Sequence, residues 1–576
     1  VLEAMKMEHL VVAPQGGIVR AILGAPGTTL MSDEPILFVE PSDTGEHVET
    51  VEDDFDLDAI RADHAHVIER HANTLDASRA AAVARRRKTN QRTTRENLEQ
   101  LLDPESFIEY GALAIAAQRR RRALDDLIAN TPADGLVTGI GTVNADHFGP
   151  EGGRCMALAY DYTVLAGTQG HMNHKKIDRM FSLAEQWRLP IVLYAEGGGG
   201  RPGDTDRLGL TGLDGPSFVQ MAKLSGLVPT VGVVSGYCFA GNAALLGCCD
   251  VIIATKNSSI GMGGPAMIEG GGLGVYHPAE VGPASFQSPN GVIDVLVEDE
   301  EEATATARKY LSYFQGATSD WRAADQRLLR RAIPENRLRV YDIRNVIETL
   351  ADEGSVLELR RAFGVGMVTA LIRIEGKPFG LIANNSKHLG GAIDAEAGDK
   401  AARFLQLCDA FDLPVLSLCD TPGFMVGPEA EKTAIVRHVA RMFVVGASLT
   451  VPIFTIVLRK GYGLGAQAMA GGGFHAPFFT VAWPTGEFGG MGLEGYVRLG
   501  FRKEMEAIED LAEREAWYQA KVAQMYENGK ATSIASVFEI DDVIDPAETR
   551  RWVMAGLSSV PKVSRDGKKR PCVDAW

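Results

Sequence analysis

Residues 174–200, HKKIDRMFSLAEQWRLPIVLYAEGGGG, align without a gap on residues 398–424, GDKAARFLQLCDAFDLPVLSLCDTPGF, at a spacing of 224 residues. Six positions are identical: Lys176 and Lys400, Arg179 and Arg403, Leu183 and Leu407, Leu189 and Leu413, Pro190 and Pro414, and Gly199 and Gly423. The register continues upstream, where ALAYD (157–161) falls on LIANN (381–385). A repeat this long indicates one domain present twice and not a solenoid.

The chain divides into four segments by composition. Residues 1–41 hold short β-rich runs separated by Gly, Pro and Asp, and residues 42–75 form an acidic linker that becomes helical. From about Gly135 onward, apolar strand-like runs alternate with amphipathic helical segments and Gly-rich turns, which predicts an α/β fold. We expect an N-lobe over 76–335 and a C-lobe over 336–576, because the run ENRLRVYDIRNVIETLADEGSVLEL begins the second copy.

Each lobe contains two Gly-rich turns after apolar runs. They are AEGGGGRPGD (195–204) and SGYCFAGNAALLG (235–247) in the first lobe, and DTPGFMVG (420–427) and RKGYGLGAQAM (459–469) in the second. Glycine lets backbone N–H groups approach a ligand closely, and two such groups would form an oxyanion hole for a thioester enolate. A single turn of this kind also closes a tight corner or holds a phosphate. Four turns at matching positions favour the oxyanion interpretation.

Lys6 lies between two methionines in EAMKMEH, at a predicted turn between β runs. The position predicts an exposed primary amine at the tip of a hairpin. A long flexible side chain of this kind suits amide attachment of a carrier group better than an ordinary surface role.

Composition and missing motifs exclude several classes of protein. The 576 residues carry a net charge of −17, which is unfavourable for nucleic acid and for anionic membranes. The seven cysteines form no CxxC pair, so we expect reduced thiols, no metal site and a cytoplasmic location. No GxSxG, HExxH or GxxxxGK[ST] motif occurs, and no apolar run is long enough to span a bilayer. The first residues, VLEAMKMEHL, include no initiator Met or signal peptide, so we expect them to lie inside a larger protein.

Residues from about 80 to 576 resemble the carboxyltransferase subunit of biotin-dependent acyl-CoA carboxylases, of the propionyl-CoA and methylcrotonyl-CoA carboxylase β-subunit type. The matching stretches include RTTRENLEQLLDPESFIEYG, SGYCFAGNAAL, DTPGFMVG, RKGYGLGAQAM and MGLEGYVRLGFRKE. The AMKM motif resembles that of the biotinyl domain, of which only the second half is present in residues 1–41. Together they are similar to the C-terminal part of a single-chain long-chain acyl-CoA carboxylase. The resemblance implies two crotonase-like domains related by duplication, preceded by a partial all-β biotinyl domain.

The resemblance also implies roles for individual residues. The backbone N–H groups of Ala240 and Gly241 would hold the enolate of an acyl-CoA, and those of Leu464 and Gly465 would hold the ureido oxygen of biotin. Lys6 would carry the biotin. Further cofactor-binding residues would be Gly198, Gly199, Gly423 and Phe424. The sequence departs from the family where EGGGGRPGD replaces DSGGARIQEG and where Leu464 replaces a glycine.

The implied reaction moves a carboxyl group from carboxybiotin to the α-carbon of an acetyl-, propionyl- or longer acyl-CoA and gives a malonyl-CoA-type product. The holoenzyme would be a ligase that forms a carbon–carbon bond in fatty acid metabolism. ATP, Mg and bicarbonate would be used only by a biotin carboxylase domain or subunit outside this chain. The implied assembly is a homo-oligomer, a hexamer built as a trimer of dimers, with the active site at the dimer interface.

Other charged residues and three alternative functions are also considered. The run Arg85–Lys88 is either a site for CoA phosphate or a solvated helix face, and the acidic run at 298–302 is a solvated helix start. His171, His174 and His388 are expected to be structural rather than acid–base groups. The alternatives are a biotin-dependent decarboxylase or transcarboxylase, a biotin-independent crotonase-type hydratase or isomerase, and a scaffold for carboxylase subunits. The last two leave Lys6 or the four intact turns unexplained.

Overall fold

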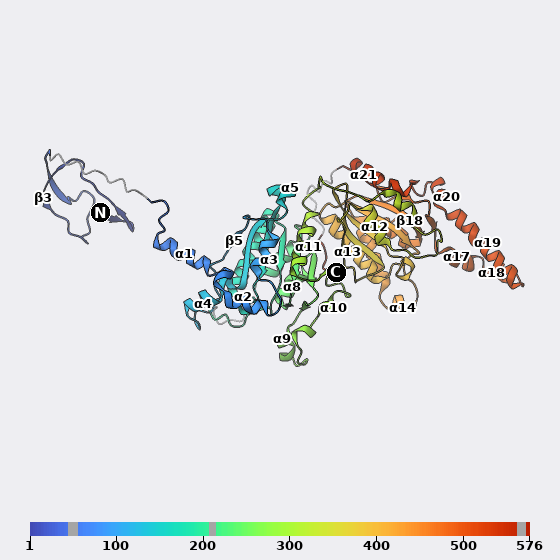
Figure 1. Cartoon of the computed structure of the whole chain (residues 1–576), viewed down its shortest axis with the longest axis horizontal. Coiled ribbons are helices and arrows are strands. Elements are labelled where there is room, and N and C mark those ends of the chain that lie inside the picture. The colour runs from blue at the N-terminus through green and yellow to red at the C-terminus, as the bar shows by residue number, and fades with distance from the viewer. Residues whose placement is uncertain (44–55, 207–214, 562–571) are drawn as a thin grey trace. The chain divides into compact units, whose positions relative to one another are not determined.

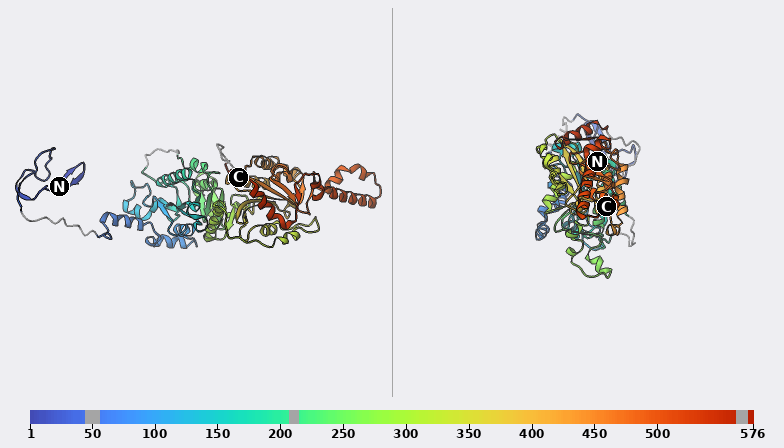
Figure 2. Two further views of the ribbon diagram at one scale, coloured as in Figure 1. Left: turned by 90° about the horizontal axis from the view of Figure 1, so that it is seen from above. Right: turned by 90° about the vertical axis from the view of Figure 1, so that its right-hand side faces the viewer.

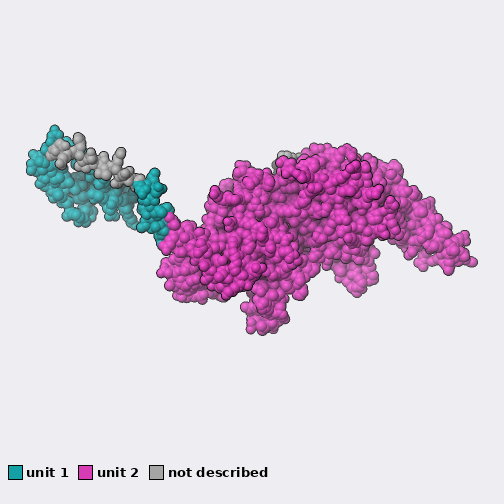
Figure 3. All heavy atoms as spheres, in the orientation of Figure 1, with its two compact units in different colours: residues 1–66 teal, residues 67–576 magenta. Residues whose placement is uncertain are grey.

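The structure is a computed structural model that describes residues 1–43, 56–206, 215–561 and 572–576. It divides into two compact units, residues 1–66 and residues 67–576 (Figure 3). The division falls inside the predicted linker 42–75, of which residues 44–55 lie outside the described residues. Helix α1 (Ala62–Ala72) includes the point of division and agrees with the prediction that the linker becomes helical.

The described strands of unit 1 form two antiparallel hairpins. Strands β1 (Leu2–Ala4) and β2 (Met7–His9) form the first, and β3 (Gly17–Ile22) and β4 (Leu37–Pro41) form the second. The strands are shorter than the β-rich run at 9–14 predicts, since β2 ends at His9. Every described residue of this unit is exposed or half-buried, so the two hairpins form no core of their own.

The N-lobe is built on a seven-stranded sheet (Figure 1). In spatial order its strands are β13 (Val295–Val297), β11 (Val251–Thr255), β9 (Thr230–Val234), β8 (Ile191–Tyr194), β7 (Arg154–Tyr160), β6 (Leu136–Thr142) and β5 (Ile108–Tyr110). The strands from β7 to β13 are parallel, and β5 and β6 are antiparallel additions. A separate parallel pair joins β10 (Tyr237–Phe239) to β12 (Ser259–Gly261).

The helices of the N-lobe connect these strands. They are α2 (Ala80–Arg87), α3 (Thr94–Leu101), α4 (Leu124–Asn130), α5 (Ala145–Gly152), α6 (His171–Trp187), α7 (Ser217–Lys223), α8 (Gly241–Gly247), α9 (Pro265–Gly270), α10 (Ala284–Gln287) and α11 (Glu300–Ser312). Residues 207–214 of this lobe lie outside the described residues. Alternating helices and parallel strands agree with the α/β fold that the sequence predicts.

The C-lobe is built on an eight-stranded sheet. Its strands run in the order β14 (Leu357–Leu359), β15 (Met367–Ile374), β16 (Lys377–Asn384), β17 (Val415–Thr421), β18 (Ile453–Tyr462), β19 (Phe479–Ala482) and β21 (Asp542–Val543), and β20 (Glu487–Gly489) pairs with the end of β18. The pairs from β16 to β21 are parallel, and β14 and β15 are antiparallel additions, as in the N-lobe.

The C-lobe helices include a projecting arm. They are α12 (Ile343–Leu350), α13 (Ala395–Ala410), α14 (Pro428–Glu431), α15 (Ile435–Ser448), α16 (Gly463–Met469), α17 (Leu493–Gly500), α18 (Arg502–Glu506), α19 (Leu511–Gly529), α20 (Ala531–Ser536) and α21 (Thr549–Ser559). Helices α17 to α19 extend away from the sheet (Figures 1 and 2) and have a small core of their own around Val497, Tyr518 and Val522. Residues 562–571 lie outside the described residues.

The two lobes repeat the same elements at the spacing of 224 residues. Helix α6 corresponds to α13, strand β7 to β16, and strand β8 to β17. The aligned lysines have the same role in each copy, because the ammonium group of each donates to two backbone carbonyls, although Lys400 is buried and Lys176 is half-buried. Lys176 donates to the carbonyls of Ala133 and Leu136, and Lys400 donates to those of Arg360 and Phe363. The internal repeat read from the sequence is therefore present in the structure.

Polar contacts join the lobes across a packed seam. Arg360 of the C-lobe donates to the Asp294 carboxylate of the N-lobe at 3.0 Å, and Arg403 donates to the Asp250 carbonyl at 2.5 Å. Arg403 also donates to the Asp574 carbonyl at 3.3 Å. Buried apolar side chains from both lobes form one continuous core beside these contacts.

Candidate functional site

The two Gly-rich turns of the N-lobe meet at Gly199 and Gly241. A side chain added to Gly199 would lie 2.6 Å from the Ala240 Cβ and 3.3 Å from the Gly241 nitrogen, and the φ angle of Gly199 is +82°. Both the space and the backbone conformation therefore require glycine here. Gly198 precedes this contact in the same turn.

The C-lobe brings its two turns together in the same way. A side chain added to Gly465 would lie 2.7 Å from the Gly423 carbonyl carbon and 3.1 Å from the Phe424 nitrogen. Gly465 belongs to the first turn of α16, as Gly241 belongs to the first turn of α8. Sequence reasoning thus identified residues that the fold places next to each other in both lobes.

The same backbone hydrogen bonds hold both turns. The Gln169 N–H donates to the Gly199 carbonyl at 2.7 Å, and Arg201 N–H donates back to the Gln169 carbonyl at 2.8 Å. In the C-lobe, 224 residues later, the Ile393 N–H donates to the Gly423 carbonyl at 3.0 Å, and Met425 N–H donates to Ile393 at 2.8 Å. The side chains at these positions differ, so the repeated part of the site is its backbone.

One predicted N–H group is already occupied. The Ala240 N–H donates to the Gly261 carbonyl at 3.0 Å, because it continues the parallel pairing of β10 with β12. This corrects the expectation that Ala240 and Gly241 both offer free N–H groups. Among the described residues, the N–H groups of Gly241, Leu464 and Gly465 have no acceptor. Ala240 instead has a φ of 53° and a ψ of −123°, and this uncommon conformation turns the chain into α8.

Behind the N-lobe turn lies a buried ion cluster. Arg86 donates through both terminal nitrogens to the Glu196 carboxylate, each at 2.7 Å, and Arg86 Nη2 lies 3.4 Å from Glu300. One guanidinium therefore faces two carboxylates, and all three side chains are at most 10% exposed. Burial raises the pKa of Glu196 to about 7. The Glu196 carbonyl accepts from Asn242 Nδ2 at 2.9 Å, which ties the cluster to α8.

The C-lobe has a matching buried ion cluster in which positive groups outnumber negative ones, the reverse of the N-lobe cluster. Arg459 donates to both oxygens of Asp420, the residue aligned with Glu196, at 3.2 and 2.8 Å. The Lys460 ammonium is 3.9 Å from the same carboxylate. Here one carboxylate faces two cations, and the side chain of Asp420 is fully buried.

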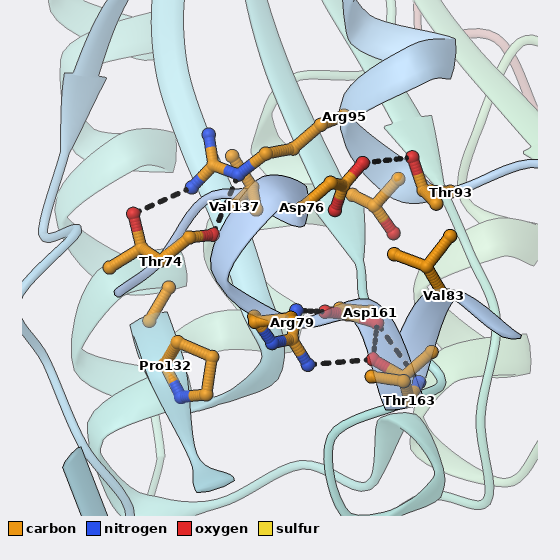
Figure 4. Close-up of a pocket in the computed structure, with 13 residues that line it drawn as sticks. Thr74, Asp76, Arg79, Val83, Thr93, Arg95, Pro132, Val137, Asp161 and Thr163 are labelled. Carbon is orange, nitrogen blue, oxygen red and sulfur yellow. Dashed lines mark hydrogen bonds and ion pairs between the residues drawn. The ribbon is translucent and has the colours of Figure 1, made fainter. Parts of the chain in front are cut away.

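In the basic run Arg85–Lys88, Arg86 has neither of the two predicted roles, a site for CoA phosphate or part of a solvated helix face. Arg86 is buried, because α2 lies across the carboxyl ends of β7 and β8. Arg79, seven residues earlier on the same helical face, pairs with Asp161 at 2.7 Å beside Thr163 (Figure 4). Glu300 is likewise buried and not part of a solvated helix start. The i, i+7 spacing of the two arginines was the available signal.

The Lys6 prediction is confirmed in its local geometry. Met5 and Lys6 form the turn between β1 and β2, both with left-handed φ angles of 52° and 65°. The Lys6 side chain is exposed, and its ammonium has no hydrogen-bond or ion-pair partner among the described residues. An amine in this position is free to carry a covalent group.

The histidines lie in local polar contacts. His174 Nδ1 is 3.0 Å from the Ser217 hydroxyl, which donates to Asp178, and His388 Nε2 is 3.1 Å from Asp394. The Ser217 proton is directed to a carboxylate, so this trio is not arranged as a nucleophile with its base. Within the described ranges, no three His, Cys, Asp or Glu side chains form a group that could hold a metal ion.

Comparison with known proteins places these features in a family. Residues 85–570 match the family described as the carboxyl transferase domain. The chain is 32% identical over 511 residues to the methylmalonyl-CoA carboxyltransferase 12S subunit of Propionibacterium freudenreichii subsp. shermanii, with 85% of this chain and 93% of that protein covered. It is 30% identical over 515 residues to the propionyl-CoA carboxylase beta chain of Saccharopolyspora erythraea, with 86% and 92% covered.

Two solved structures are similar as well. A single-chain, multi-domain long-chain acyl-CoA carboxylase gives a TM-score of 0.82 at 58% identity and covers 96% of this chain. This chain spans 53% of that protein, or about half its length. The hexameric transcarboxylase 12S gives a TM-score of 0.75 at 30% identity, with 89% of this chain and 99% of that one covered. In the part of the chain that the structure describes, the helices are too short or too polar to cross a bilayer.

Proposed function

This chain belongs to the carboxyl transferase family, and we propose that it transfers a carboxyl group between biotin and the α-carbon of an acyl-CoA. The observation that carries the proposal is the matching approach of two glycine turns, one in each lobe, at Gly199 with Gly241 and at Gly423 with Gly465. We infer further that the two sheets are crotonase-like domains related by duplication, since their strands, helices and turn hydrogen bonds correspond at one spacing.

In this proposal the backbone supplies most of the catalysis. The Gly241 N–H, held beside Gly199, would donate to the thioester oxygen as it becomes an enolate. The N–H groups of Leu464 and Gly465, beside Gly423 and Phe424, would donate to the ureido oxygen of biotin. Donors that are fixed before the reaction stabilise a negative charge that exists only during it, and this term is usually the largest in such sites.

Lys6 is the proposed attachment point for the biotin, which would supply the carboxyl group and serve as its carrier. The exposed turn and the unpaired ammonium among the described residues fit that role. Every described residue of unit 1 is exposed or half-buried, which fits a biotinyl domain of which only the second half is present. The remaining half and a biotin carboxylase that uses ATP, Mg and bicarbonate would belong to the same holoenzyme.

The acyl group and the assembly are proposed from the relatives. The similarity to a long-chain acyl-CoA carboxylase at 58% identity supports a long acyl chain, and the similarity to a hexameric transcarboxylase supports a hexamer built as a trimer of dimers. The active site would then lie at a dimer interface. The cytoplasmic location stays a prediction of the sequence.

Carboxyl transfer to free biotin tests the function in this chain by itself. The chain is incubated with biotin and a 2-carboxyacyl-CoA labelled in the carboxyl group, and transfer of the label to biotin is measured. We expect transfer with the wild type and equal transfer with Lys6→Arg, because free biotin replaces the attached one. Absence of transfer from malonyl-, methylmalonyl- and long-chain 2-carboxyacyl-CoA alike would contradict the proposal. Hydration of an enoyl-CoA without biotin would instead indicate a crotonase-type hydratase.

A further inference from the structure

Strand β20 forms a wall beside the C-lobe turn at residues 463–465, which begins α16. The strand runs parallel to the end of β18, with Gly489 opposite Tyr462, the residue that directly precedes the turn. A side chain added to Gly463 would lie 3.0 Å from the carbonyl oxygen of Gly490, the residue after β20. The position of β20 therefore limits where the first residues of α16 can lie.

Glu487, the first residue of β20, carries a carboxylate into the interior of this wall. Its side chain is 1% exposed, and its Oε1 atom lies 3.6 Å from Nη1 of Arg337. Burial raises the pKa of Glu487, and the charge of Arg337 opposes that rise. An unpaired charge inside a protein is strongly destabilising, so the place of β20 in the fold depends on this cation.

Arg337 also reaches the projecting arm of helices α17 to α19. Its Nη2 atom donates to the carboxylate of Glu494 in α17 at 2.5 Å. Its guanidinium carbon lies 5.5 Å from the centre of the Tyr526 ring in α19. The side chain is half-buried among these partners. One guanidinium therefore connects β20 to two helices of the arm.

The backbone of Arg337 is fixed by the ion cluster behind the turn. Arg459 Nη1 donates to the carbonyls of Arg337 and Arg339 at 2.9 and 2.7 Å. The other two guanidinium nitrogens of Arg459 donate to Asp420. A continuous series of contacts therefore runs from Asp420 through Arg337 to the arm.

A cavity of about 430 Å³ lies between the turn and the arm. Gly463 and Gly490 line it together with Tyr496 of α17 and Met525 of α19. Its volume is in the range of small-molecule sites, about 300–1,000 Å³. Because Arg337 contacts both β20 and the arm, it fixes two walls of this cavity relative to each other.

The corresponding strand of the N-lobe is uncharged. Strand β12 pairs with β10 as β20 pairs with β18, and it consists of Ser259, Ile260 and Gly261. A substitution of Arg337 should therefore alter the turn of the C-lobe and leave that of the N-lobe as it is.

We propose that Arg337 is a positioning residue for the C-lobe turn. By pairing with Glu487 and Glu494 it holds β20 and the arm against the turn, and so fixes the N–H groups of Leu464 and Gly465. The inference rests on the proposed function, because those N–H groups are the ones assigned to the ureido oxygen of biotin. Arg337 acts through these elements and takes no part in making or breaking bonds.

Steady-state kinetics of carboxyl transfer to free biotin tests this role in the full chain. The variant is Arg337→Met, and the matched control is Arg339→Met, because Arg339 lies in the same segment with an exposed side chain. We expect the KM for biotin to rise about tenfold in Arg337→Met, and the KM for the 2-carboxyacyl-CoA to change by less than about twofold. Arg339→Met should keep both wild-type values.

Two further variants test the charge pair itself. Glu487→Gln removes the buried charge that Arg337 neutralises, so adding it to Arg337→Met should lower the KM for biotin again. Arg337→Lys keeps the charge and loses the forked guanidinium, so we expect a rise of about threefold in the KM for biotin. Arg337→Lys decides the question where Arg337→Met does not fold.

Hydrogen exchange measures the position of the turn without reference to activity. In Arg337→Met the amides of α16 and β20 should exchange at least about tenfold faster than in the wild type. The amides of α8, at the start of which the N-lobe turn lies, should exchange at the wild-type rate.

The outcomes separate the two proposals. An unchanged KM for biotin in Arg337→Met would overturn the role of Arg337, as would equal rises in both KM values or the same changes in Arg339→Met. Absence of transfer by the wild type would overturn the proposed function. Faster exchange confined to α16 and β20 would then still support the positioning role, and unchanged exchange would overturn that as well.

Discussion

The N-lobe and the C-lobe hold their glycine turns with the same backbone and support them with opposite charges. Each turn is fixed by the same two hydrogen bonds, at Gln169 and at Ile393. Behind the first turn one arginine faces two carboxylates, whereas behind the second one carboxylate faces two cations. The comparison indicates that the geometry of the N–H groups is the shared requirement, and that the electrostatic environment of each turn is set separately.

The largest effect is expected from filling the close approach in either lobe. In Gly199→Ala and Gly465→Ala the new Cβ atoms would lie 2.6 Å from the Ala240 Cβ and 2.7 Å from the Gly423 carbonyl carbon, so the turns must separate. We expect carboxyl transfer to fall about 100-fold or more in each variant, as on loss of an oxyanion donor. The assay is transfer to free biotin under saturating substrate.

Matched glycines provide the control for these variants. Gly247 ends α8 and Gly473 follows α16, and a side chain at either would have no neighbour within 4 Å. Gly247→Ala and Gly473→Ala should keep wild-type rates. Loss of activity in only one of the two site variants would show that the lobes do not share the reaction.

Replacing the buried arginine of each lobe tests the difference in charge between the two ion clusters. Arg86→Met leaves Glu196 and Glu300 without a cation, whereas Arg459→Met leaves Asp420 beside Lys460. We expect Arg86→Met to lower the free energy of unfolding by about 3–5 kcal/mol and Arg459→Met by less. Denaturation in urea measures both values. The opposite order would contradict the charge difference between the lobes.

A smaller effect of pH should follow from the aligned lysines. Burial lowers the pKa of Lys176 to about 8 and that of Lys400 to about 7, below the ordinary value of 10.5. Between these values and about 10.5 the unfolded chain binds more protons, so each lysine makes stability rise with pH in that window. Relative to the wild type, Lys400→Met should flatten this rise from about pH 7 and Lys176→Met only from about pH 8. Unfolding measured in urea from pH 6 to 10 tests this, and identical slopes would contradict it.

Local pattern was enough to predict the repeat, the α/β class, the turn at Lys6 and the four Gly-rich turns, whereas the approach of the turns to one another in each lobe comes from the structure. Helix, proline, strand and glycine follow one another within 27 residues, so the signal at 174–200 is contained in one short window. The Lys6 turn likewise depends on neighbours within a few residues.

The misses depend on partners far along the chain. The Ala240 N–H is occupied because β10 pairs with β12 some 22 residues later, where Gly261 supplies the acceptor. Arg86 is buried because it pairs with the carboxylate of Glu196, which lies 110 residues away in the sequence. The i, i+7 spacing of Arg79 and Arg86 indicates one helical face, but it does not identify a partner that lies far along the chain, so a basic run and a free N–H were the natural expectations.

Leu464 shows how a site built from backbone N–H groups tolerates a change of amino acid. Its side chain is 60% exposed, while its N–H is the group proposed to act. Nineteen of the twenty amino acids carry that hydrogen, and proline is the exception. A library randomised at this codon should therefore retain activity within about twofold for small and apolar replacements and lose it for Leu464→Pro, as an assay of carboxyl transfer would measure. Relatives that differ at this position can keep the same chemistry, so at such a site the backbone conformation is expected to be better conserved than the amino-acid sequence.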